Sequence, residues 1–249
     1  MEETKNTSAI ILDRRAYREG DSLITCYTAK FGKLTLAARG TKKLQSKLAG
    51  HLEPISLVDL MIIPGKHFDY IGAASGRDAF ASIKENLNKL YFSGQAINWF
   101  DRLVKENQAD DRLFFLLSEW LRVMAEYPGP DFSRENGEVL LAFFALRLLS
   151  ELGYKPELEH CLICGQKIKP GQNYFDLLSG GLVGEECILE RKKREGYEAR
   201  QTPPISDNSI KALRYMASNR FIQAQKIVID KKTIKELNII ISQFIQYVG

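Results

Sequence analysis

Three cysteines in the second half of the chain have the spacing of metal ligands. Cys161 and Cys164 form a Cys-x-x-Cys pair that Gly165 follows, and Cys187 comes later. Two thiolates at this spacing can reach one tetrahedral ion, and the glycine lets the backbone turn around it. In a four-cysteine ribbon the position three before Cys187 would carry another cysteine, but here it is Gly184. The spacing predicts a zinc-ribbon-like module with one structural zinc on three cysteines and an uncertain fourth ligand.

Two interpretations of this module stay open. In the first, the fourth ligand comes from His160, from a carboxylate such as Glu185 or Glu186, or from water. In the second, the metal site has been lost, and the segment is held by apolar packing. The side chains available for that packing are Leu162, Tyr174, Phe175 and Leu182.

The motifs of the chain do not support catalysis. A nucleobase deaminase needs His-x-Glu well upstream of Pro-Cys-x-x-Cys, whereas Glu159-His160 directly precedes Cys161 here. A redox Cys-x-x-Cys sits after a strand in a βαβ unit, but this pair follows an expected helix. The sequence contains no G-x-x-x-x-G-K-[ST] phosphate loop. We therefore predict that the protein is not an enzyme.

Basic residues gather near the N-terminus, although the net charge of the chain is only +4. The window from Ser22 to Leu52 has no acidic residue but contains six Lys or Arg. Such a cluster can neutralise phosphates and give salt-sensitive affinity for nucleic acid, or it can be a solvated loop. The candidate DNA-binding residues are Arg14, Arg15, Arg18, Lys33, Arg39, Lys42, Lys43 and Lys47. Tyr17, Tyr27 and Phe31 are candidates for base stacking.

The elements that position these residues divide into a strand-rich part and a helix-rich part. Before residue 80, about five short β-like runs alternate with glycine turns, as in an OB-fold or an SH3-like barrel. Lys42–Ala49 could be the short helix of an OB-fold. From Ile83 onward, apolar residues recur at helical spacing. We predict an α+β multidomain protein with an OB-fold at 1–80, an α-helical domain at 81–249, and the cysteine module inserted at 158–194.

The chain has the composition of a soluble cytoplasmic protein. Its first residues lack the basic and apolar regions of a signal peptide. The longest near-apolar run, Val139–Leu149, is interrupted by Arg147 and is shorter than the roughly 20 residues of a membrane span. Four cysteines are too few for a disulfide scaffold of this size.

Several N-terminal residues follow a recognisable order after the first apolar strand. They are Tyr17, Glu19, Asp21, Thr28, Gly32, Ala38-Arg39-Gly40, Ser46, Leu52 and Pro54. The cysteine pair followed by Gly180-Gly181 continues the pattern. In these features the chain resembles the RecO family, bacterial recombination mediators and DNA-repair proteins. Gly184 departs from the four-cysteine form of the family, which affects the zinc expectation and not the resemblance.

The resemblance implies more than the residues alone. Proteins of this family bind single-stranded and double-stranded DNA, anneal complementary strands and act with RecR. They help to load the RecA recombinase onto DNA covered by single-strand-binding protein (SSB), whose C-terminal tail they contact. The resemblance thus implies a cytoplasmic, nucleoid-associated mediator of recombination in DNA repair, with no membrane partner. The alternative is a protein-interaction adaptor with an incidental basic loop.

Overall fold

A computed structural model of the chain describes residues 3–43, 45–127, 132–195, 201–219 and 221–249. The chain divides into two compact units, Met1–Pro130 and Asp131–Gly249. This division falls inside the segment 81–249 that we expected to form one helical domain. The first unit therefore combines the strands with the helices that directly follow them.

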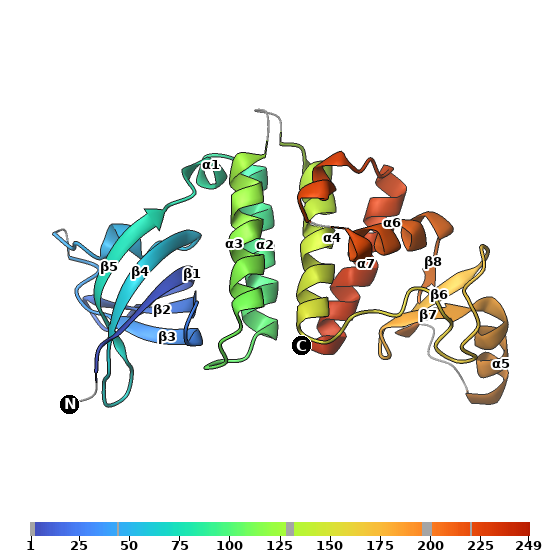
Figure 1. Cartoon of the computed structure of the whole chain (residues 1–249), viewed down its shortest axis with the longest axis horizontal. Coiled ribbons are helices and arrows are strands. Elements are labelled where there is room, and N and C mark those ends of the chain that lie inside the picture. The colour runs from blue at the N-terminus through green and yellow to red at the C-terminus, as the bar shows by residue number, and fades with distance from the viewer. Residues whose placement is uncertain (1–2, 44, 128–131, 196–200, 220) are drawn as a thin grey trace. The chain divides into compact units, whose positions relative to one another are not determined.

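Five strands form the barrel of the first unit (Figure 1). Their order is β1-β2-β3-β5-β4, and β4 pairs back onto β1, so the sheet closes on itself. The seam between β3 and β5 is narrow, because it consists of one parallel pair, Ala37 with Tyr70. A five-stranded Greek-key barrel of this kind is an OB-fold, which confirms the predicted fold class. The strands are β1 (Lys5–Tyr17), β2 (Asp21–Thr28), β3 (Gly32–Ala38), β4 (Ser56–Ile63) and β5 (Tyr70–Asp78).

Alternating side chains fill the barrel, as period-two patterning requires. Along β4, every second residue is buried, including Val58 and Ile62. The first strand is longer than its apolar run suggests, because its early part pairs with β4 and its later part with β2. The pairing with β2 shifts between Ile11 and Asp13, which is the kind of irregularity that bends a strand.

The segment Lys42–Ala49 was expected to be a helix, but its described residues, all except residue 44, form turns and bends, so that expectation was wrong. Only a short 3-10 turn follows at Ala49–His51. The Arg14 guanidinium donates a hydrogen bond of 3.1 Å to the Ala49 carbonyl oxygen, and Leu48 packs against the barrel core. These tertiary contacts hold the segment in an irregular course.

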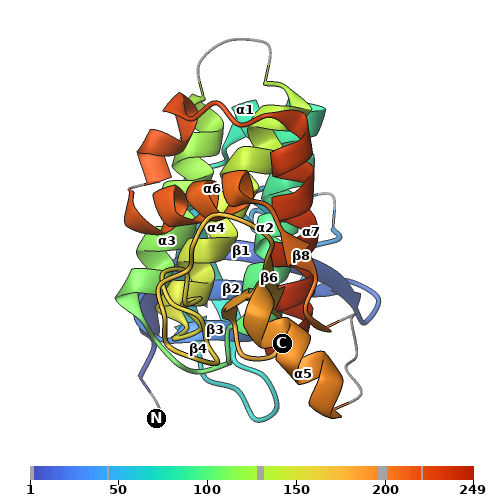
Figure 2. The same ribbon diagram turned by 90° about the vertical axis from the view of Figure 1, so that its right-hand side faces the viewer.

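Three helices complete the described part of the first unit: α1 (Ala81–Lys84), α2 (Leu87–Leu103) and α3 (Asp111–Glu126). The two longer helices lie side by side (Figures 1 and 2). Each has one buried tryptophan, Trp99 on α2 and Trp120 on α3. Asn86 and Asp110 cap their N-termini by accepting backbone hydrogen bonds.

A helical layer forms most of the second unit, with α4 at its centre. This helix is buried on almost every side, and α6 and α7 pack against it. Figure 2 shows α4 and α7 running beside each other. The helices are α4 (Arg134–Glu151), α6 (Asp207–Ser218) and α7 (Lys231–Val248), with a 3-10 turn at Phe221–Lys226.

A small sheet and one helix build the cysteine module of the same unit. The sheet has the order β7-β6-β8. It is fixed to the helical layer where Phe175 meets Phe244 of α7, with ring centroids 5.5 Å apart. Gly180 lies so close to the Phe244 ring that a Cβ there would approach it to 2.8 Å. The elements are β6 (Asn173–Asp176), β7 (Gly181–Gly184), α5 (Glu185–Glu195) and β8 (Pro204–Ile205).

In the part of the chain that the structure describes, no helix combines the length and the apolar character needed to cross a bilayer.

Candidate functional site

Four of the predicted DNA-binding side chains lie exposed on the connection that follows β3. They are Arg39, Lys42, Lys43 and Lys47, which we call the basic loop. No carboxylate of a described residue forms an ion pair with any of the four. Two hydrogen bonds attach the start of this loop to the β1–β2 turn and the start of β2: the Lys42 N–H donates to the Gly20 carbonyl oxygen at 3.2 Å, and the Gly40 N–H donates to the Asp21 carboxylate at 2.8 Å. The basic loop therefore presents uncompensated positive charge from an anchored backbone.

Two other predicted residues point to partners inside the first unit. Lys33 is 12% exposed, and its Nζ lies 2.5 Å from the backbone oxygen of Asp101 and 3.3 Å from its carboxylate. Arg14 is 18% exposed and forms an ion pair with Glu53. Their role in DNA binding stays a prediction, for which the geometry offers a structural alternative. Each joins segments far apart in the sequence.

The remaining predicted cations, Arg15 and Arg18, are exposed. Arg15 lies 3.3 Å from the carboxylate of Asp13. Arg18 sits in the β1–β2 turn, where its φ is +48°, and its guanidinium lies 5.2 Å from the centre of the Tyr17 ring. Arg18 therefore lies over an aromatic ring at the end of the barrel.

Three aromatic rings, Tyr17, Phe68 and Tyr70, lie at the same end of the barrel, and we call them the aromatic rim. The centroids of Tyr17 and Phe68 are 5.9 Å apart in an edge-to-face arrangement. The Arg39 guanidinium lies 4.5 Å from the Tyr70 centroid. The pairing of Ala37 with Tyr70 brings the end of β3, and hence Arg39, to this place.

Sequence reasoning found Tyr17 but missed the other two rings. Phe68 is 38% exposed, and its place beside Tyr17, rather than its exposure, sets it apart from the other exposed apolar side chains. Nothing in the local sequence sets Phe68 and Tyr70 apart, because only closure of the barrel brings the β4–β5 connection beside the β1–β2 turn.

The two other rings expected to stack are differently placed. Tyr27 is fully buried, so its expected role as a stacking platform was wrong. Its hydroxyl accepts a 3.1 Å hydrogen bond from the Asp110 N–H, and its ring packs edge-on against Phe100 at 5.0 Å. Phe31 is half-buried against the barrel core, with the Lys5 ammonium 5.6 Å from its centroid.

The basic loop and the aromatic rim have the chemistry of a single-strand binding surface. In OB-folds, the connections between strands 1 and 2 and between strands 4 and 5 bind oligonucleotides. Here these connections contain Arg18 and Phe68. Cations that follow a phosphate backbone, next to rings on which bases stack, are the usual means of binding single strands without sequence preference.

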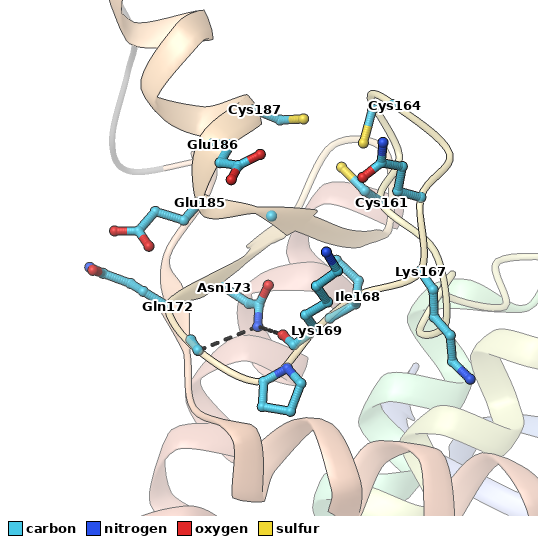
Figure 3. Close-up of a pocket in the computed structure, with 14 residues that line it drawn as sticks. Cys161, Cys164, Lys167, Ile168, Lys169, Gln172, Asn173, Glu185, Glu186 and Cys187 are labelled. Carbon is cyan, nitrogen blue, oxygen red and sulfur yellow. Dashed lines mark hydrogen bonds between the residues drawn. The ribbon is translucent and has the colours of Figure 1, made fainter.

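The three cysteines of the second unit form a potential metal site. The Sγ atoms of Cys161, Cys164 and Cys187 all lie within 4.8 Å of one another. In Figure 3 the three sulfurs point toward a common centre. Because a zinc–sulfur bond is about 2.3 Å long, sulfurs on one tetrahedral zinc are separated by roughly 3.8 Å. Small shifts of the side chains would therefore let the three thiolates hold one ion.

The backbone around the knuckle prepares Cys161 to be a thiolate. Burial raises the pKa of its thiol, but N–H groups of Cys164, Gly184 and Ile163 directed at the sulfur outweigh burial and lower the pKa to about 7. Burial and the two neighbouring sulfurs raise the pKa of Cys187 to about 12. Cys187 thus keeps its proton in the metal-free cluster, and a bound divalent ion would displace that proton.

The other candidate ligands do not join this cluster. The group of mutually close ligand atoms contains no imidazole or carboxylate from the described residues. His160 is exposed, with its Nδ1 3.6 Å from a carboxylate oxygen of Glu157. Glu185 points away from the sulfurs in Figure 3. The structure brings together the three predicted cysteines, and no His, Asp or Glu of the described residues joins them; Glu186 lies on the side of the sulfurs in Figure 3 but outside this close group.

Comparisons with known proteins cover nearly the whole chain. The N-terminal family model of recombination protein O matches residues 1–80, and the C-terminal model matches residues 84–248. A DNA repair protein RecO from Dehalococcoides mccartyi is 29% identical over 242 residues, which are 97% of this chain and 89% of the relative. The protein of the same name from Desulforamulus reducens is 26% identical over 239 residues, 96% of this chain and 87% of the relative. A third, from Roseiflexus, is 29% identical over 97% of this chain and 80% of its own length.

Proposed function

The chain belongs to the RecO family of DNA repair proteins, and from this premise we propose that it is a non-enzymatic recombination mediator that binds DNA through its barrel. The proposed DNA surface consists of the basic loop, the aromatic rim and Arg18. Arg15, Arg14 and Lys33 are less directly placed for this role.

The proposal rests on one observation: exposed basic side chains of the basic loop lie next to the aromatic rings of the rim. The cations of the basic loop are exposed and lack carboxylate partners among the described residues, and Arg39 lies directly over Tyr70. A solvated loop without a ligand would not need aromatic side chains next to it. The combination supports binding to single strands, with double strands held by charge alone.

The finer parts of the proposal follow from family membership. We infer that the protein anneals complementary strands and, with RecR, helps to load RecA onto DNA covered by SSB, whose C-terminal tail it contacts. In this proposal residues 1–80 bind DNA and residues 81–249 contact protein partners. The site of action is the nucleoid in the cytoplasm. The cysteine module, 158–194, would hold one structural zinc.

Salt dependence tests the DNA surface directly. Replacing Lys42, Lys43 and Lys47 by alanine removes up to three phosphate contacts, so the slope of log K against log salt should flatten by about two for single strands. The measurement is a fluorescence-anisotropy titration with an unrelated oligonucleotide at several salt concentrations.

A matched control replaces three exposed lysines of the second unit, Lys211, Lys232 and Lys235. This variant has the same net charge but should keep the wild-type slope. If the wild type, the basic-loop variant and the control variant all gave the same slope, the basic loop would not be part of the DNA surface. If purified DNA does not bind while acidic protein tails do, the adaptor function would replace the proposed one.

A further inference from the structure

The cysteine cluster provides three sulfur ligands, but a tetrahedral ion takes four. In a closed structural site, the fourth ligand would come from the position of Gly184. The backbone of Gly184 is in place, because its N–H is directed at the Cys161 sulfur. Position 184 lacks only a side chain with a ligand atom. The backbone geometry of the site is therefore kept, while the fourth coordination position of a bound ion would have no donor from this residue.

The space at this corner is open. A Cβ built on Gly184 would meet no atom within 4 Å. A pocket extends from the three cysteines to Gly184, with Lys167 and Lys169 among its lining residues. Both lysines are exposed, and neither has an ion-pair partner among the described residues. A small molecule can therefore reach the fourth corner without displacing protein.

The softness of the three thiolate ligands, rather than the surrounding charge, favours a sulfur donor at this corner. Three thiolates and a divalent ion leave one negative charge, and a fourth thiolate would add another. The pocket lining adds Lys167 and Lys169 but also Glu185 and Glu186, so its formal charges balance and do not decide which donor binds. Thiolates are soft ligands, and a set of three already selects metals that prefer sulfur.

We propose that a metal ion on Cys161, Cys164 and Cys187 keeps its fourth coordination position open to this pocket and accepts a small thiol from solution. The thiol binds as a thiolate, releases its proton to solvent and replaces a water molecule on the metal. The centre would then exchange a ligand, unlike a closed four-cysteine site. The inference rests on the metal binding included in the proposed function, and does not depend on DNA binding.

Cobalt absorption spectra of the full chain test this proposal. Co²⁺ replaces zinc in thiolate sites and reports its ligands through sulfur-to-metal charge-transfer and d–d bands. The wild-type protein loaded with Co²⁺ should show a saturable spectral change when 2-mercaptoethanol is added, with about one thiol bound per metal. In Gly184→Cys, the charge-transfer band should be stronger from the start, and added thiol should leave the spectrum unchanged.

Gly184→Ala is the matched control, because it adds a Cβ without a ligand atom and should respond to thiol as the wild type does. A wild-type spectrum that shows tetrahedral cobalt but ignores the thiol would overturn the proposal. In that case Glu185→Gln or Glu186→Gln should alter the spectrum by removing a protein ligand. Absence of cobalt binding by the wild type would also overturn it, whereas DNA binding in the anisotropy assay would be unaffected by either result.

Discussion

Two lysines of the same barrel, Lys33 and Lys43, differ in whether the charge is held inside the fold or exposed to solvent. Lys33 directs its ammonium to the backbone oxygen and carboxylate of Asp101, whereas Lys43 is exposed on the basic loop. The sequence around Lys33 carries no sign of this, because Asp101 lies on α2 and is brought close only by the fold. Local charge counting therefore cannot distinguish a lysine that is paired inside the fold from one that is exposed.

This contrast gives a prediction for two single substitutions. Lys33→Ala should lower the free energy of unfolding by about 1–3 kcal/mol, because it removes a largely buried charged hydrogen bond and leaves the Asp101 groups without that partner. Lys43→Ala should change stability by no more than about 0.5 kcal/mol. Urea unfolding of both variants measures the difference. If Lys33→Ala is as stable as the wild type but its DNA affinity depends less steeply on salt, Lys33 contacts DNA instead of stabilising the fold.

The aromatic rim gives a prediction on strand preference. Phe68→Ala removes a ring that is 38% exposed and lies outside the barrel core cluster, so folding should be preserved. Base stacking contributes about 1–3 kcal/mol per base, and the loss should fall on single-stranded DNA. Affinity for a duplex should change much less, because its bases are already stacked. Parallel titrations with a single strand and its duplex separate the two effects, and an equal loss on both would contradict a stacking role.

At the scale of elements, patterning predicts what depends on local periodicity. The alternation of apolar residues gives the strands, and helical spacing from Ile83 gives the helices. The course of Lys42–Ala49 was not predictable in this way, because the Arg14 hydrogen bond to Ala49 and the packing of Leu48 decide it. The cysteine spacing located all three thiols of the cluster, since a Cys-x-x-Cys knuckle is a local structure and Cys187 follows β7 directly.

The last helix offers a test of local capping. Asp230 accepts hydrogen bonds from the N–H groups of Lys232 and Thr233 at 3.1 and 3.0 Å, which stabilises the start of α7. Asp230→Ala should lower the free energy of unfolding of the second unit by about 1 kcal/mol, whereas Asp230→Asn should have little effect because Asn is as good a cap. Thermal unfolding followed by circular dichroism can measure both. Equal losses in the two variants would show that charge, rather than capping, is what matters.

At the scale of the whole molecule, the two compact units predict separate responses to metal removal. A bound ion would link the knuckle at Cys161 to the start of α5, both in the second unit. A chelator should therefore increase amide hydrogen exchange around residues 157–188 and leave the barrel strands unchanged. DNA affinity should also be kept. Exchange measured by mass spectrometry, with zinc added back as the control, would reveal a wider metal role if the barrel also lost protection.

The two tryptophans give the molecule a built-in optical label. The chain has only Trp99 and Trp120, and both are buried in the helix pair α2–α3 of the first unit. Their intrinsic fluorescence therefore follows the unfolding of that unit, and the second unit can melt without a change in tryptophan emission. Far-ultraviolet circular dichroism senses the helices of both units. Two denaturation curves from one sample, one from each signal, will coincide only if the two units unfold together.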